Sequence, residues 1–202
     1  MTSPPPLQYG SYYHIFNRGN NRENLFYEGQ NYRYFMKLYA RYIELVADTY
    51  AYCLLRNHFH ILVRIKSEDE IKLSHGDTHT FKDLNPSQQF SSLFNAYAKA
   101  INKTYHRTGS LFINPFGRIQ ITSDSHFIYL IAYIHLNPQK HGFVKDFYTW
   151  PYSSYQAFYK GKITRLKSDD VMAWFGGRSQ FEEFHHANVD FAVIRDEVMD
   201  DP

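Results

Sequence analysis

The sequence predicts an α+β domain built on an antiparallel sheet, and three observations lead to this fold class. First, strand-like and helix-like segments follow one another in the order strand, helix, hairpin, helix, strand, helix. Second, two strand-like runs, residues 49–55 and 58–65, are separated only by Arg56 and Asn57, which indicates a tight hairpin. Third, 44% of the 202 residues are hydrophobic and 21% are charged, which is an ordinary globular composition.

The individual elements follow from hydrophobic periodicity. Residues 12–16 are rich in β-formers and run into an Asn- and Gly-containing turn at 17–21. A helix is expected over 31–47, because apolar residues recur there at helical spacing. The remaining expected elements are a polar loop over 67–88, a helix over 90–105, a strand over 116–122, a helix from Ser123 or Asp124 to Pro138, and short helices within 170–174 and 180–199.

Charge and cysteine content narrow the possible classes of protein. The net charge of +2 and the pI of about 8.5 permit nucleic-acid binding without arguing for it, so any such site must come from local basic clusters. The single cysteine, Cys53, excludes an intramolecular disulfide and a cysteine-based zinc cluster. With no signal peptide and no long apolar run, we expect a cytoplasmic protein that does not bind a membrane.

The most informative motif is His58-Phe59-His60. Alternate residues of a strand point to the same side, so the two imidazoles can converge on one metal ion. The chain has 11 histidines, so an isolated pair more often lies simply on a solvated or half-buried face, and the pair alone is weak evidence for a metal site. A catalytic metal also usually needs a third protein ligand and an open position for substrate.

The helix over residues 127–136 offers the missing groups. Tyr133 lies roughly opposite Ile131, one residue of the apolar stripe, and Tyr129 and Asn137 share the face of Tyr133. A phenol is a poor nucleophile because its pKa is near ~10, so a base or a positive charge has to assist it. Asn137 can provide an oxygen ligand. A packed aromatic at Tyr133 and a helix cap at Asn137 remain open alternatives, and His135 is predicted to be a core histidine.

Five segments together form a recognisable series. They are Tyr-His-Ile-Phe-Asn-Arg-Gly-Asn-Asn at 13–21, Ala-Tyr-Cys-Leu-Leu-Arg-Asn-His-Phe-His-Ile-Leu-Val-Arg at 51–64, Tyr-Ile-His-Leu-Asn-Pro at 133–138, His-Gly-Phe-Val at 141–144 and Trp-Pro-Tyr-Ser-Ser-Tyr at 150–155. In this order they resemble the single-tyrosine HUH transposases, and within them the REP-associated tyrosine transposases. The resemblance covers roughly residues 10–156. We therefore expect a transposase domain (10–156) between a proline-rich, flexible lead-in (1–9) and a C-terminal extension of unknown role (157–202).

The resemblance implies a ferredoxin-like antiparallel sheet with helices packed on it. It assigns metal binding to His58 and His60, the nucleophile to Tyr133 and the third ligand to Asn137. The implied reaction is transesterification on single-stranded DNA, in which the tyrosine attacks a phosphate, stays attached to the 5′ end and releases a 3′ hydroxyl. The implied metal is Mg²⁺ or Mn²⁺, the substrates carry hairpins formed by imperfect palindromes, and the protein is a monomer or a homodimer.

Two segments depart from the family pattern. Leu55 and Arg56 stand where the family often has Pro or Met-Pro ahead of Asn-His. Residues 108–118 keep only part of the usual Gly-x-Leu-Phe followed by Arg-Phe-Lys, which puts substrate contacts there in doubt.

Several basic and amide side chains are candidate DNA contacts. A solvated surface explains any single one of them, but as a set they can contact phosphates, with a strength that falls as salt rises. Backbone amides of the 17–21 turn can also hold a phosphate. The candidates are Arg18, Asn20, Arg56, Lys99, Lys103, Arg107 and Arg118.

Two other functions compete with the transposase. A DNA-hairpin-binding protein with lapsed catalysis would keep the fold and lose the reaction. A hydrolytic metalloenzyme acting on small phosphoesters would use the same histidines, but the chain lacks the extra acidic ligands that such sites commonly use.

Overall fold

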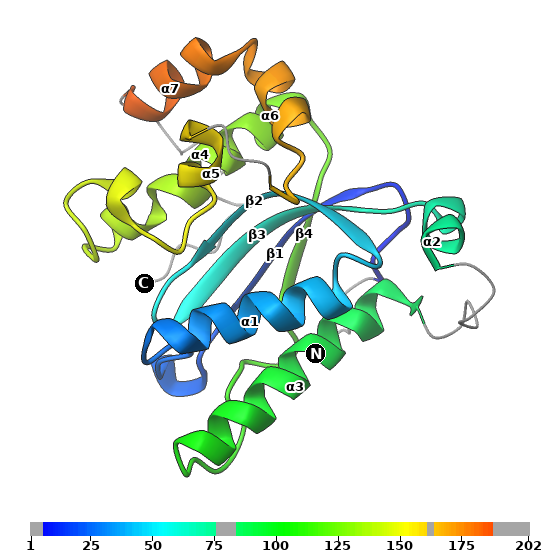
Figure 1. The fold of residues 1–202 in the computed structure, drawn as a ribbon, viewed down its shortest axis with the longest axis vertical. Coiled ribbons are helices and arrows are strands. Elements are labelled where there is room, and N and C mark those ends of the chain that lie inside the picture. The colour runs from blue at the N-terminus through cyan, green and yellow to red at the C-terminus, as the bar shows by residue number, and fades with distance from the viewer. Residues whose placement is uncertain (1–5, 76–83, 161–163, 188–202) are drawn as a thin grey trace.

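The sheet at the centre of the fold has four strands in the order β2-β3-β1-β4, and every pairing is antiparallel (Figure 1). The computed structural model describes residues 6–75, 84–160 and 164–187. The strands are β1 (Tyr12–Arg18), β2 (Ala47–Leu54), β3 (His58–Ile65) and β4 (Gly117–Ile121). The predicted α+β class, with a ferredoxin-like antiparallel sheet, is confirmed.

Helices cover both faces of this sheet (Figure 1). Helices α1 (Gly29–Tyr42) and α3 (Pro86–Thr104) pack on one face, and α4 (Asp124–Lys140) packs on the other. Three further helices lie on the α4 side, namely α5 (Tyr155–Tyr159), α6 (Ser168–Phe175) and α7 (Arg178–His186). The remaining short elements are α2 (Glu68–His75) and the 3-10 turns η1 (Asn20–Arg22) and η4 (Phe147–Thr149).

Strand β3 is buried on both faces because side chains alternate along it. Phe59, Ile61 and Val63 enter the core beneath α1 and α3, whereas Leu62 enters the core beneath α4. The same alternation turns His58 and His60 to the α4 side. The strand is therefore held by apolar packing on one face while its polar side chains face one helix on the other.

Helix α1 ends earlier than the predicted 31–47 range. The apolar pattern continues through Ile43 and Val46, and both side chains are fully buried. The backbone nevertheless turns there, with the amides of Val46 and Ala47 donating to the carbonyl of Ile43 at 2.9 and 2.8 Å. Ala47 then pairs with Ile65 as the first residue of β2. Burial by itself could not distinguish a helical turn from this tight connection.

The expected loop over 67–88 contains helical structure, so that prediction was wrong in part. Ser67 and Glu70 cap the start of α2 reciprocally: the Ser67 amide donates to Glu70 Oε2 at 2.7 Å, and the Glu70 amide donates to Ser67 Oγ at 3.2 Å. Helix α3 begins at Pro86, four residues before the predicted start, because Asn85 caps it by accepting from the Gln88 amide at 3.0 Å. Residues 76–83 lie outside the described residues.

Pro138 does not end α4, which continues to Lys140, so the predicted stop was wrong. Pro138 has no backbone N–H to donate within the helix. The residues that follow it nevertheless form backbone hydrogen bonds that complete the last turn. The His141 amide donates to the Asn137 carbonyl at 3.0 Å, and the Phe143 amide donates to the Pro138 carbonyl at 2.9 Å. At the other end the helix starts as predicted, with the Ser123 hydroxyl accepting from the His126 amide at 3.2 Å.

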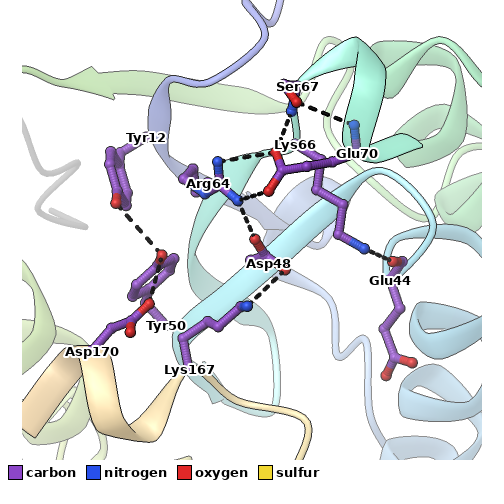
Figure 2. A network of polar contacts seen from close by, with 10 residues as sticks. All are labelled: Tyr12, Glu44, Asp48, Tyr50, Arg64, Lys66, Ser67, Glu70, Lys167 and Asp170. Atoms are coloured by element: carbon purple, nitrogen blue, oxygen red, sulfur yellow. Dashed lines mark hydrogen bonds and ion pairs between the residues drawn. The ribbon is translucent and has the colours of Figure 1, made fainter. Parts of the chain in front are cut away.

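The C-terminal extension is docked on β2 by a backbone hydrogen bond and by the side-chain contacts of Lys167 and Asp170, which Figure 2 draws. The Lys167 amide donates to the Thr49 carbonyl at 2.9 Å. The Tyr50 hydroxyl donates to Asp170 Oδ2 at 3.3 Å, and Lys167 Nζ lies 3.6 Å from Asp48 Oδ1. Helices α6 and α7 bear out the expected short helices, whereas residues 188–202 lie outside the described residues.

Three further predictions concern the N-terminal lead-in, the single cysteine and membrane-spanning helices. Of the expected lead-in, residues 1–5 lie outside the described residues, while Leu7 is buried in the core beneath α1 and α3. Cys53 is a buried free thiol. Among the helices of the described residues, none combines the length and the apolar character that crossing a membrane requires.

Candidate active site

His58 and His60 lie side by side on the α4 face of β3, as their alternate spacing predicts. Their ring centroids are 5.3 Å apart and both side chains are buried. The His58 ring also lies 4.9 Å from the ring of His141, which follows the end of α4. The imidazoles thus gather where one end of β3 meets the C-terminal end of α4.

Asn137 brings an amide oxygen to His58. Asn137 Oδ1 lies 3.3 Å from His58 Nε2, and the Asn137 side chain is fully buried. On the other side of the ring, His58 Nδ1 lies 2.8 Å from Asn57 Oδ1, which can only accept. A neutral His58 has one ring proton for two oxygen acceptors, so when Nδ1 donates to Asn57 the Nε2 lone pair faces the Asn137 oxygen. Two acceptors that face each other in this way form the start of a cation site.

The amide nitrogen of Asn137 supports the same interpretation. Within the described residues, this buried Nδ2 has no hydrogen-bond partner. An asparagine with only a structural role would turn its Nδ2 toward the His58 acceptor, because a buried donor without a partner costs ~1–3 kcal/mol. The side chain instead presents its oxygen. The arrangement fits a metal ligand better than a helix cap.

His60 is held by a third histidine, His14 on β1. His60 Nδ1 lies 2.9 Å from His14 Nε2, and the two rings stack with centroids 5.1 Å apart. Both side chains are buried. Burial first, and then the proximity of His14, hold the pKa of His60 well below its usual range. His60 is therefore neutral, which is the form in which an imidazole binds a metal.

Tyr133 lies one turn before Asn137 on α4 and faces His60. The two ring centroids are 5.5 Å apart, with an interplanar angle of 87°. Lys140 Nζ lies 5.1 Å from the centre of the Tyr133 ring and brings a positive charge to the phenol. Tyr129, the other tyrosine on this side of the helix, contacts the ring of Phe184 on α7 at 5.4 Å. The structure thus brings Tyr133, and not Tyr129, to the histidine pair.

The donor set consists of two imidazole nitrogens and one amide oxygen. No group of three or more His, Cys, Asp or Glu side chains suited to a metal occurs in the part of the chain that the structure describes. The predicted set of His58, His60 and Asn137 is of a different kind, because its third member is an amide. Imidazole and oxygen ligands together suit Mn²⁺, and Mg²⁺ accepts the oxygen and retains water.

A small cavity of about 100 Å³ opens beside the histidine pair. It leaves open space next to the imidazoles. Its walls come from the end of β1, the start of β3, the start of β4 and the segment before β4. The lining residues are Phe16, Asn17, Arg18, His58, Phe59, His60, Ile113, Pro115, Gly117 and His141.

The candidate DNA contacts do not all lie in one place. Arg18 lines the cavity, and Arg56 is exposed in the loop just before His58. Arg107 is ion-paired with Glu23, and its Nη1 donates to Asn102 Oδ1 at 2.7 Å, so it has a structural role. Asn20 lies half-buried in η1.

The other three cationic candidates lie on the α3 side of the sheet. Lys99 and Lys103 are exposed on α3. Arg118 on β4 places its guanidinium 4.0 Å from the centre of the Phe116 ring, and its Nη1 donates to Ser87 Oγ at 3.3 Å. A strand of DNA in contact with these residues and with the histidines would have to pass around the end of the sheet.

Sequence reasoning did not assign roles to His14, His141 or Lys140 in this site. His14 and His141 belong to two of the segments that carry the family resemblance, and that was the signal available. Their convergence depends on the pairing of β1 with β3 and on the turn after α4.

The chain was compared with family models, curated proteins and solved structures. No family model matches the chain. A protein of Haemophilus influenzae described as "Putative REP-associated tyrosine transposase" is 28% identical over 120 residues, which are 57% of this chain and 63% of that protein. A solved structure, described as a REP-associated tyrosine transposase bound to a REP hairpin, superposes with a TM-score of 0.59 at 18% identity, covering 85% of this chain and 93% of the other.

The chain is similar to the REP-associated tyrosine transposases. The resemblance predicted from the sequence is therefore confirmed, and the solved structure shows that the fold is shared. The chain spans 63% of the length of the curated relative, so the activity of the whole relative does not transfer with the match.

Proposed function

We propose that this protein nicks and rejoins hairpin-bearing single-stranded DNA through a covalent 5′-phosphotyrosine at Tyr133. One observation carries the proposal: Tyr133 and Asn137, one turn apart on α4, face His60 and His58 on β3. His58 Nε2 lies 3.3 Å from Asn137 Oδ1, and the His60 and Tyr133 ring centroids are 5.5 Å apart. The similarity to REP-associated tyrosine transposases supports the same reaction class.

The side chains divide the reaction into metal binding, nucleophilic attack and charge stabilisation. His58, His60 and Asn137 would hold one Mg²⁺ or Mn²⁺ ion, which would stabilise the negative charge that develops on the scissile phosphate. The hydroxyl oxygen of Tyr133 forms a bond to phosphorus and loses its proton. The bond to the 3′ oxygen breaks, and that oxygen leaves as a hydroxyl. Lys140, whose Nζ is 5.1 Å from the ring centre, places a positive charge beside the phenol.

The proposed site is formed by side chains of one chain. Tyr133 and Asn137 come from α4, and His58 and His60 come from β3 of the same molecule. The proposal therefore includes a monomer that acts in cis. A homodimer with exchanged helices is the alternative that a measurement of mass in solution would detect.

The test is a covalent-capture assay with Mn²⁺ and a hairpin oligonucleotide that has single-stranded arms, taken from the DNA around the gene. A label at the 3′ end follows the fragment that remains on the tyrosine. We expect a protein–DNA adduct on a denaturing gel with the unmodified protein and none with Tyr133→Phe. Tyr129→Phe, on the same helix, is the matched control and keeps the adduct.

Three results would contradict the assignment. An adduct with Tyr133→Phe that is lost with Tyr129→Phe would move the nucleophile. Hairpin binding without any adduct in Mn²⁺ would identify a DNA-hairpin-binding protein, and turnover of small phosphoesters without an adduct would identify a hydrolase.

A further inference from the structure

A second and larger pocket adjoins the active-site cavity. Its volume is about 390 Å³, against about 100 Å³ for the cavity at the histidine pair. Asn17 and Ile113 line both spaces, so the two are neighbours across these residues. The pocket lies between α3 and the 109–116 segment, and none of the proposed chemistry uses it.

The wall of this pocket is aromatic. Phe94, Phe112 and Phe116 line it, and their side chains are mostly buried against one another. The ring of Phe94 lies 5.2 Å from that of Phe112 and 5.3 Å from that of Phe116. These rings are fixed by core packing, so they form a rigid apolar surface of the kind on which a nucleobase stacks.

The rim of the pocket is polar and carries positive charge. Ser91, Asn95 and Lys99 line it from one side of α3, and Asn95 and Lys99 are exposed. None of the lining residues is acidic. Within the described residues, Lys99 is not a member of any ion pair, so its ammonium group is available to a phosphate.

The 109–116 segment, which forms one wall of the pocket, is held in place by hydrogen bonds from two side-chain amides and one hydroxyl. Asn17 Nδ2 donates to the Ile113 carbonyl at 3.1 Å, and Asn102 Nδ2 donates to the Gly109 carbonyl at 2.9 Å. The Ser110 hydroxyl donates to the Phe112 carbonyl at 2.6 Å. The pocket is therefore built before a ligand arrives, which lowers the entropic cost of binding.

We propose that this pocket binds one unpaired base of the DNA strand that runs through the active site, with the adjacent phosphate at Lys99. The aromatic wall takes the face of the base, and Asn95 and Ser91 reach its polar edge. The inference rests on the proposed function, because it is the position of the pocket next to the histidine cavity that identifies the ligand as DNA. It explains how a strand is positioned in register for cleavage at one phosphate.

The experiment fills the pocket without removing a polar group. Ala98 lines the pocket on α3, and Ala98→Leu narrows it. Ala100→Leu is the matched control, because Ala100 is half-buried on the same helix and does not line the pocket. The probes are the gene-flanking hairpin oligonucleotide with single-stranded arms and a series of copies with one abasic site at successive arm positions. Affinity is measured by fluorescence anisotropy without metal.

For the unmodified protein we expect one abasic position near the cleavage site to weaken binding about five- to 150-fold, the range of one base–aromatic stack. Ala98→Leu weakens binding of the intact probe by a similar factor and is insensitive to that abasic position. Ala100→Leu behaves like the unmodified protein. An abasic series with no sensitive position, or an Ala98→Leu protein that keeps the same sensitive position, would overturn the inference.

A second variant keeps the inference testable if Ala98→Leu does not fold. Lys99→Gln changes only an exposed side chain. It should reduce the slope of log binding constant against log salt concentration by about one. Replacing one arm phosphate by an uncharged methylphosphonate should abolish the difference between Lys99→Gln and the unmodified protein. Lys37→Gln, exposed on α1, is the matched control and should leave the salt dependence unchanged. A Lys99→Gln protein with an unchanged salt dependence would contradict the phosphate contact.

The two proposals fail in different ways. If the unmodified protein forms the Tyr133 adduct while the abasic series is flat, the base pocket is wrong and the proposed function stands. If it neither binds the hairpin nor forms an adduct, the proposed function itself fails.

Discussion

At the residue scale, His14 is the side chain whose role the geometry defines most sharply. For His60 to bind a metal through Nε2, its proton must be on Nδ1 and must be donated to His14 Nε2, 2.9 Å away. A partner of this kind fixes the tautomer and the orientation of a ligand, and its loss typically costs about 10- to 100-fold in metal affinity. His14 is thus a positioning residue for the proposed metal.

We therefore expect His14→Phe to raise the Kd for Mn²⁺ at least about tenfold, measured from free Mn²⁺ by electron paramagnetic resonance. His14→Gln should recover part of the affinity, since an amide oxygen can accept the His60 proton. The exposed His186→Gln variant should bind Mn²⁺ like the unmodified protein. Equal affinity in His14→Phe and the unmodified protein would remove His14 from the site.

Spacing along one element was enough to place some site residues and not others. Tyr133 and Asn137 could be placed on one side of a helix, and His58 and His60 on one side of a strand, because both patterns are local. His14 meets His60 only through the register in which Phe16 pairs with His60. No periodicity encodes that register, so the contact could not be predicted from the sequence.

At the element scale, the turn after β1 depends on Gly19. The Gly19 amide donates to the Asn57 carbonyl at 2.7 Å, which joins this turn to the loop ahead of His58. A Cβ on Gly19 would lie 1.9 Å from the Glu23 carbonyl oxygen, which is a backbone atom that cannot rotate away. The glycine is required by this close approach, since its φ of −62° is one that any residue adopts.

Gly19→Ala should lower the free energy of unfolding by about 1–3 kcal/mol, measured by urea denaturation, because the backbone must shift to admit the methyl group. Gly29→Ala is the matched control, since a Cβ there would meet only side-chain atoms, the nearest being the Tyr152 hydroxyl oxygen at 3.1 Å. We expect that control to change stability by less than about 1 kcal/mol. A Gly19→Ala protein as stable as the control would show that this turn is adaptable.

The types of the main elements followed from periodicity, whereas some of their ends did not. Strand β3 has the predicted bounds, because a run of β-forming residues with apolar side chains at every second position begins directly after the Arg56-Asn57 turn. Helix α1 stops at Tyr42 although the apolar pattern continues, and α4 continues through Pro138 although proline usually ends a helix. In both cases tertiary packing and backbone bonds at the terminus override a local preference.

At the scale of the whole molecule, the C-terminal extension packs on the back of the helix that carries Tyr133 and Asn137. His135 Nδ1 on α4 lies 2.8 Å from His185 Nε2 on α7, and the rings of Phe127 and Trp174 have centroids 4.5 Å apart. His135 was predicted to be a core histidine, and it is fully buried. Its partner lies 50 residues away, which is why the sequence pattern could not reveal the pair.

This buried histidine pair makes the stability of the protein depend on pH. Burial lowers the pKa of His185 to about 4 and holds the pKa of His135 well below its usual range. The unfolded chain therefore takes up protons near the ordinary histidine pKa of ~6.5, while the folded protein does not. Stability is unaffected above that pKa and falls as the pH drops from about 7 toward 4.

The contribution of His185 to this loss should be about 2 kcal/mol at pH 5, because each unit of pKa difference corresponds to ~1.4 kcal/mol. His185→Gln should be less stable at pH 7, where it loses the contact with His135, and should show a shallower decline between pH 7 and pH 5. Urea denaturation at a series of pH values measures both effects, and His186→Gln, exposed on the same helix, should decline as the unmodified protein does. If His185→Gln loses stability with falling pH as steeply as the unmodified protein, then His185 is protonated in the folded state, and the α4–α7 contact is not a neutral histidine pair.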